Sequence, residues 1–159
     1  MVYLKLVVRN LSRCNGNLKL ENGKILLMEE KIVIRSFQDL RVYQNLYSAM
    51  KIVLTKIIPK LPKEEKYDLV DQMRRCCKAC PALLSEGFAK RYQKINWQKY
   101  LNDTIGEANE MIHHLSVCID IYFKYLDMDL CKKLINDYDI CCRQLTNLKK
   151  AWRNYHEIN

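Results

Sequence analysis

A helical period of apolar residues, which begins near Ser36 and continues almost to the C-terminus, constrains the fold of this chain more than any other feature. In four successive segments, apolar residues recur every three or four positions, a spacing that places them along one face of an α-helix. Four long amphipathic helices with short links close most naturally into an antiparallel up-down-up-down arrangement. The sequence therefore predicts an all-α four-helix bundle. Its helices are expected at about 36–58, 62–88, 96–122 and 128–155.

Polar signals at the ends of these segments support the helix boundaries. Ser36 with Asp39 three residues later is a capping-box pattern, which predicts a helix start. Pro62 fits the first turn of the second helix, because the missing N–H of proline is not needed there. Asn96 is the expected N-cap of the third helix. We therefore expect a bundle domain that spans residues 36–156.

Residues 1–35 form a separate N-terminal extension with a different pattern. Apolar and polar residues alternate, and Asn22-Gly23 lies between two apolar runs. Such a dipeptide is typical of a β-hairpin turn. A second interpretation is a poorly ordered extension, because Met28 also stands where translation of the bundle can begin. The sequence leaves both interpretations open.

Composition limits the environment of the protein. Apolar residues make up 49% of the 159 residues, which is enough for a sizeable core. The sequence shows no secretory signal and no apolar run of the roughly 18 residues that a membrane span needs. We therefore expect a cytoplasmic location, no membrane association, and reduced cysteines packed in the core. The eight cysteines are Cys14, Cys76, Cys77, Cys80, Cys118, Cys131, Cys141 and Cys142.

Positive charge is concentrated in one part of the chain. The net charge is +9, and residues 60–99 hold ten basic against five acidic side chains. This excess favours a phosphate-rich partner, and Tyr92 and Trp97 lie among the cations, as stacking on unpaired bases requires. The alternative is structural pairing of the cations with Glu86 or with carboxylates of a neighbouring subunit. The residues expected to contact RNA or DNA are Arg74, Arg75, Lys78, Lys90, Arg91 and Lys94.

The stretch Ala79–Arg91 departs from the regular pattern of the second helix. Pro81 removes a backbone donor inside a helix, and Gly87 removes a side chain, so that another group can come close. Glu86 lies four residues before Lys90, which is a favourable spacing for an ion pair on a helix. The stretch therefore predicts a shaped, polar contact surface on a helix that is otherwise apolar.

Three segments carry further spaced motifs: "SFQDLRVYQ", "LPKEEKYDLVDQMRRCCKACPALLSEGFAKR" and "WQKYLNDTIGEANEMIHHL". Together they resemble the 23S rRNA intervening-sequence protein family, often called four helix bundle proteins, over about 36–155. The sequence departs from the family pattern in its cysteines at 76, 77 and 80 and in the extension. The matching positions are Phe37, Asp39, Leu40, Val42 and Tyr43, then Leu61, Pro62, Lys63, Glu64 and Glu65, then Gln72, Met73, Arg74 and Arg75, then Pro81, Leu84, Glu86, Gly87 and Phe88, and finally Gly106, Glu107 and Glu110.

The resemblance implies an antiparallel four-helix bundle that assembles as a homopentamer with a central channel. It also implies a link to structured RNA, because family members are encoded inside insertions of 23S rRNA genes, and it implies no known catalytic activity. Related accessory proteins of diversity-generating retroelements bind a reverse transcriptase, so a protein-recruiting scaffold is the alternative function. In such an assembly, Pro81, Glu86 and Gly87 are expected to shape the subunit contact or the channel rim.

Two spacings in the sequence fit metal sites, but both are more typical of core packing. Cys77-x-x-Cys80 lies on the apolar face of a helix rather than on a turn. Glu110-x-x-His113 has the spacing of di-iron bundle sites, but a second copy is missing. The sequence contains no Gly-rich phosphate loop, nucleophile elbow or paired catalytic carboxylates. We therefore expect a non-enzymatic protein with no cofactor and no metal, and a metal-binding bundle is the weakest alternative.

Overall fold

The computed structural model describes residues 18–21, 24–27 and 34–158. The chain divides into two compact units, Met1–Arg35 and Ser36–Asn159, and each is described by itself.

The N-terminal unit contains two short strands that pair with each other. β1 (Leu18–Glu21) runs antiparallel to β2 (Lys24–Leu27), with Glu21 opposite Lys24. This pairing agrees with the hairpin interpretation of the extension. The Asn22-Gly23 dipeptide and Met28 lie outside the described residues.

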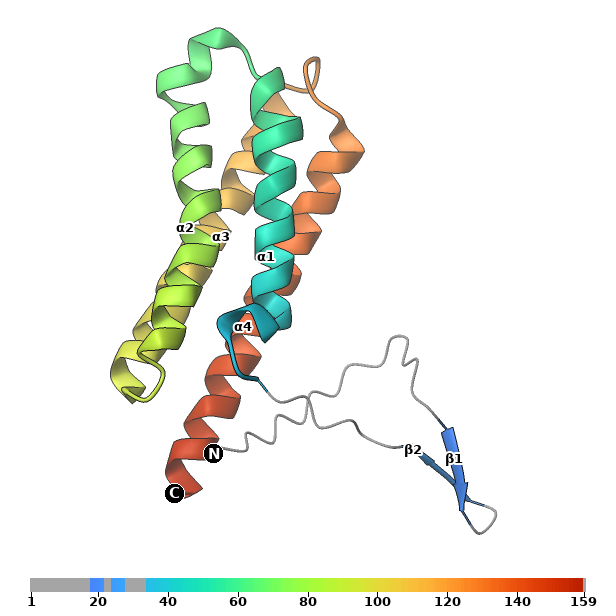
Figure 1. Ribbon diagram of the computed structural model, residues 1–159. Helices are drawn as coiled ribbons and strands as arrows, with labels where there is room; N and C mark the ends of the chain where they lie inside the picture. The colour runs from blue at the N-terminus through green and yellow to red at the C-terminus, as the bar shows by residue number, and fades with distance from the viewer. Residues whose placement is uncertain (1–17, 22–23, 28–33, 159) are drawn as a thin grey trace. The chain divides into compact units, whose positions relative to one another are not determined.

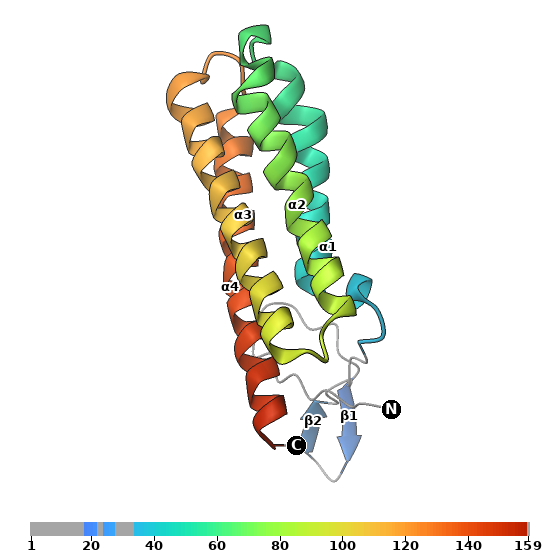
Figure 2. The same cartoon turned by 90° about the vertical axis from the view of Figure 1, so that its left-hand side faces the viewer.

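The second unit is a four-helix bundle (Figure 1). α1 packs against α2 and α4, and α3 packs against the same two helices, so α2 and α4 occupy diagonal corners. Helices that follow each other in the chain run in opposite directions (Figure 2). The predicted all-α, antiparallel four-helix bundle is therefore confirmed. The helices are α1 (Arg41–Ile52), α2 (Leu69–Ala89), α3 (Lys94–Ile121) and α4 (Met128–Ile158).

The predicted capping box at Ser36 is present. The Ser36 backbone N–H donates to Asp39 Oδ2 at 2.8 Å, and Ser36 Oγ accepts the Gln38 N–H at 3.2 Å. The box opens a single 3₁₀ turn, η1 (Phe37–Asp39), and α1 begins only after Leu40, whose backbone is extended. Beyond α1 the chain continues through a π-helical turn, η2 (Val53–Ile57), and a 3₁₀ turn, η3 (Ile58–Lys60).

Two predicted helix starts differ from the structure by several residues. Pro62 precedes a 3₁₀ segment, η4 (Lys63–Tyr67), and α2 starts at Leu69 because the backbone of Asp68 (φ −125°, ψ −102°) leaves the helical region. α3 starts before Asn96, because the Gln93 carbonyl already accepts the Trp97 N–H at 2.9 Å and closes the first turn. Proline and asparagine are good starting signals, but neither position alone decides where the helix begins.

The apolar stripes meet in the core as expected, and α2 continues without interruption through the buried Pro81. Tyr47, whose position continues the apolar spacing of α1, is instead exposed, and its ring stacks against that of Tyr43. The predicted core role of the cysteines is confirmed for the six that are fully buried. These are Cys76, Cys77, Cys80, Cys118, Cys131 and Cys141.

Candidate functional site

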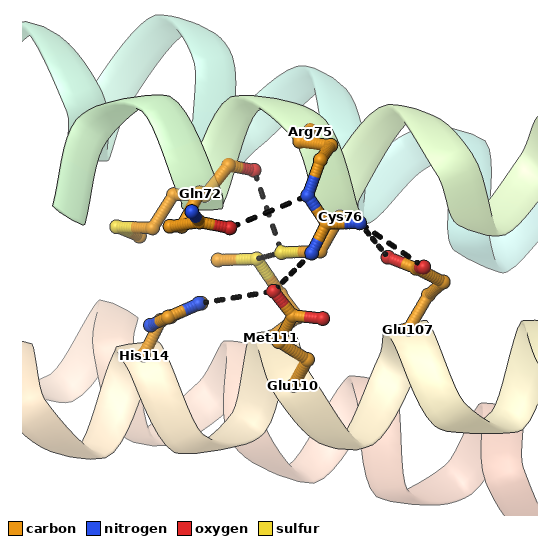
Figure 3. A network of polar contacts seen from close by, with 8 residues as sticks. Gln72, Arg75, Cys76, Glu107, Glu110, Met111 and His114 are labelled. Carbon is orange, nitrogen blue, oxygen red and sulfur yellow. Dashed lines mark hydrogen bonds and ion pairs between the residues drawn. The ribbon is translucent and has the colours of Figure 1, made fainter. Parts of the chain in front are cut away.

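The neighbouring arginines of α2 point in different directions, because consecutive residues of an α-helix are about 100° apart. Arg75 reaches α3, where its guanidinium lies 3.3 Å from Glu107 Oε1 and 2.5 Å from Glu110 Oε1 (Figure 3). Its Nε also donates to Gln72 Oε1 at 3.3 Å. Glu110 Oε1 in turn lies 3.4 Å from His114 Nε2. We call Gln72, Arg75, Glu107, Glu110 and His114 the Arg75 network.

Electrostatics within the Arg75 network favour the charged forms of Arg75 and Glu110. The hydrogen bond to Glu110, with the nearby Glu107 charge, raises the pKa of Arg75. Partial burial acts to raise the pKa of Glu110, but the bonds and charges of Arg75 and His114 outweigh it, so this pKa is lowered. Beneath the network, burial raises the pKa of the Cys76 thiol to about 12. The network therefore fastens α2 to α3 through ionised groups above a neutral thiol.

This pairing gives a pH dependence of stability. Because the pKa of Glu110 in the folded chain lies below its ordinary value of 4.5, the stabilisation is present above about pH 4.5 and is lost as the pH falls through the folded pKa. The carboxylate is partly exposed, so we expect at most about 1 kcal/mol. Urea unfolding gives the free energy of unfolding at pH 7 and at pH 4. Between these two pH values this free energy should fall less for Glu110→Gln than for the wild type. An equal fall in both would contradict a stabilising role of the Glu110 carboxylate.

The Ala79–Arg91 stretch makes its contact with α3 of the same chain. A Cβ added to Gly87 would lie 2.5 Å from Tyr100 Cβ, so the glycine lets the two backbones approach closely. Lys90 Nζ donates to Glu86 Oε1 at 2.7 Å, which confirms the expected ion pair, and the Tyr100 hydroxyl also donates to this oxygen. Lys90, expected to contact phosphate, is therefore held by Glu86 in the folded chain.

The link between α2 and α3 is fixed by aromatic contacts. The Arg91 guanidinium lies 4.3 Å from the Phe88 ring centroid and 4.4 Å from that of Tyr92, and Arg91 donates to the Phe88 carbonyl at 2.9 Å. Trp97, expected to stack on bases, is fully buried between Phe88 and Trp152, so that prediction was wrong. Tyr92 is exposed, as stacking requires, and Lys94 is exposed at the start of α3.

Arg74 points away from the Arg75 network and lines a groove of about 210 Å³ beside η3 and η4. Lys78 is exposed one turn further along α2. In the part of the chain that the structure describes, no ion pair joins Arg74, Lys78, Lys63 or Lys66 to a carboxylate. We call the surface formed by this groove and the adjacent Lys78 the basic groove. Its lining residues are Ile58, Leu61, Pro62, Lys63, Lys66, Val70 and Arg74.

The structure thus separates the six expected contact residues. Arg74 and Lys78 are exposed and make no ion pair among the described residues. The same holds for Lys63 and Lys66, two lysines of this surface that were not among the six expected contact residues. Arg75 and Lys90 are engaged with carboxylates of their own chain. The sequence signal for the lysines was present, since both fall within the basic segment. Their proximity to Arg74 depends on the path of η4, which the helical pattern did not predict.

The comparisons with known proteins agree with the fold. Among the described residues, no helix is both long and apolar enough to cross a lipid bilayer. No curated protein matches the chain. The profile of the 23S rRNA-intervening sequence protein family matches residues 38–147, a range that includes the basic groove, the Arg75 network and the Gly87 contact. Since this match covers most of the chain, the protein belongs to the 23S rRNA-intervening sequence protein family.

Proposed function

We propose that this protein is a non-enzymatic, cytoplasmic, homo-oligomeric bundle, built as the pentamer that the family resemblance implies, and that it binds RNA or DNA through the basic groove. The observation that carries the proposal is the cluster of Lys63, Lys66, Arg74 and Lys78, which are exposed and make no ion pair with a carboxylate among the described residues. Three exposed carboxylates, Glu64, Asp68 and Asp71, and the half-buried Glu65 lie nearby in sequence. Residues 60–78 therefore hold six basic against four acidic side chains and keep a net positive charge of +2.

The chemistry of the groove suits a phosphate backbone rather than individual bases. Lysine ammonium groups and an arginine on an open surface neutralise phosphates without reading base edges. The apolar floor formed by Ile58, Leu61 and Val70 allows the sugar face of a strand to approach. Repetition of the groove in each subunit would strengthen binding through multivalency. We therefore expect affinity for nucleic acid with strong salt dependence and little sequence preference.

A salt series tests this proposal directly. We expect Arg74→Gln/Lys78→Gln to lower the slope of log affinity against log salt by about 1.5, because each lost phosphate contact removes about 0.7–0.9. Binding to a fluorescent RNA hairpin with single-stranded flanks, and to duplex DNA, would be measured by anisotropy. Lys132→Gln/Lys150→Gln is the matched control, since it removes the same charge from two exposed lysines of α4, which is diagonal to α2. Equal slopes for the two double variants would contradict a role of the groove.

A protein-recruiting scaffold is the second candidate, in which the partner is a polymerase such as a reverse transcriptase. It is favoured by exposed apolar side chains on the link between α3 and α4. Phe123 and Tyr125 are more than half exposed there, and Ile121 is 61% exposed. If the salt series shows no binding to either nucleic acid, this surface becomes the better candidate.

A further inference from the structure

Three different metal-ligating groups converge where the Arg75 network meets the buried Cys76. Cys76 Sγ from α2, one carboxylate oxygen of Glu110 and a ring nitrogen of His114 from α3 all lie within 4.8 Å of one another (Figure 3). Glu110 and His114 are four residues apart, so both face α2 from one side of α3. Of the described residues, only this group of three or more His, Cys, Asp and Glu side chains is close enough to share an ion.

We propose that Cys76, Glu110 and His114 form a binding site for Zn²⁺, with a fourth position open to water. Thiolate, imidazole and carboxylate are the three side-chain ligands that zinc uses, and three protein ligands with one open position are a common zinc arrangement. Mg²⁺ and Ca²⁺ prefer oxygen ligands, so a site with sulfur and nitrogen disfavours them. Binding releases the thiol proton to solvent, because the thiolate is the ligand.

The geometry requires only a small contraction. Zinc bonds of about 2.0–2.3 Å in a tetrahedron place ligand atoms roughly 3.5 Å apart. Glu110 Oε1 and His114 Nε2 already lie 3.4 Å apart, and the other separations, at most 4.8 Å, must shorten by no more than about 1.3 Å. A shared ion would replace the present contact between Glu110 and His114. Cys76 is fully buried, whereas the Glu110 side chain is 32% exposed. The open position therefore lies on the solvent side of the site.

Arg75 competes with this ion for the Glu110 carboxylate. Its guanidinium now supplies the positive charge beside Glu110, but it also contacts Glu107 and is half exposed, so it can withdraw onto Glu107 when a metal enters. The proposed ligands differ from both spacings noted in the sequence. The cysteine ligand is Cys76, which belongs to neither end of the Cys77-x-x-Cys80 spacing. The histidine that lies beside Glu110 is His114 rather than His113.

Cobalt titration of the full chain tests the site, because thiolate-bound Co²⁺ gives near-ultraviolet charge-transfer absorption that Zn²⁺ then displaces. We expect His114→Ala and Cys76→Ala each to weaken Co²⁺ and Zn²⁺ binding by at least about tenfold. His113→Ala is the matched control and should leave binding unchanged, since this exposed neighbour lies outside the group. Circular dichroism verifies folding of each variant, and His114→Ala preserves the test if Cys76→Ala fails to fold.

Arg75→Gln adds an outcome that an incidental surface site would not produce. Removal of the competing guanidinium should tighten Zn²⁺ binding several-fold while leaving the cobalt spectrum unchanged. Absence of the charge-transfer band in the wild type, or equal affinities for the wild type and His114→Ala, would overturn the proposal. RNA binding by the basic groove does not depend on either result, because none of the three ligands lines that groove.

Discussion

Replacement of Gly87 by alanine is expected to lower the free energy of unfolding by about 2 kcal/mol. The new Cβ would lie 2.5 Å from Tyr100 Cβ and 3.1 Å from two atoms of the Trp97 ring. Tyr100 Cβ is attached directly to the backbone of α3, and the Trp97 ring is fully buried, so α2 and α3 would have to separate. The helix-propensity gain of roughly 1 kcal/mol from glycine to alanine is smaller than this overpacking.

Urea unfolding of Gly87→Ala and Gly106→Ala isolates the packing effect. Gly106 lies in α3 and is exposed, and a Cβ added there meets no atom within 4 Å. The same substitution should therefore stabilise the protein by about 0.5–1 kcal/mol at Gly106. If both substitutions stabilise the protein, α2 and α3 do not approach each other as closely at Gly87 as the structure shows.

Tyr138→Phe is expected to raise the free energy of unfolding by about 1 kcal/mol. The Tyr138 hydroxyl is fully buried in α4 and has no hydrogen-bond partner among the described residues. Burial near several cysteine side chains, Cys80 first among them, raises the pKa of this hydroxyl, so it stays neutral. A buried hydroxyl without a partner loses its hydration and gains nothing in return, and its removal relieves roughly 1–3 kcal/mol of desolvation.

Tyr122→Phe is the matched control for this prediction. The Tyr122 hydroxyl donates to Glu65 Oε1 at 2.5 Å, and this bond raises the pKa of the tyrosine to about 12. Loss of the bond should lower the free energy of unfolding by about 1 kcal/mol, opposite in sign to Tyr138→Phe. Thermal and urea unfolding give both values. A destabilised Tyr138→Phe variant would mean that this hydroxyl has a partner in solution.

Most of the fold could be predicted because local patterns encode it. The three-and-four spacing identified the helices, and the Ser36 capping box and the Glu86–Lys90 pair involve residues close in sequence. Such interactions depend on the helical period alone. The buried cysteines followed from the same reasoning, since they occupy positions of the apolar stripe.

The candidate site could be predicted only in part, because it depends on how α2 and α3 align. Arg75 finds its carboxylates 32 and 35 residues further along the chain, and no local pattern specifies that register. The burial of Trp97 has the same origin, since Gly87 admits its ring between α2 and α4. Charge composition identified the basic segment, but it could not distinguish an arginine facing solvent from one facing α3.

Arg74 and Arg75 offer the sharpest comparison, because they carry the same charge and the structure gives them different roles. Arg74→Gln and Arg75→Gln would each be measured for RNA affinity at low salt and for free energy of unfolding. We predict that Arg74→Gln weakens RNA binding by about 3- to 10-fold at unchanged stability. We expect Arg75→Gln to lower the free energy of unfolding by up to about 1 kcal/mol with little change in affinity. Equal losses of affinity in the two variants, or none in Arg74→Gln, would contradict binding through the basic groove.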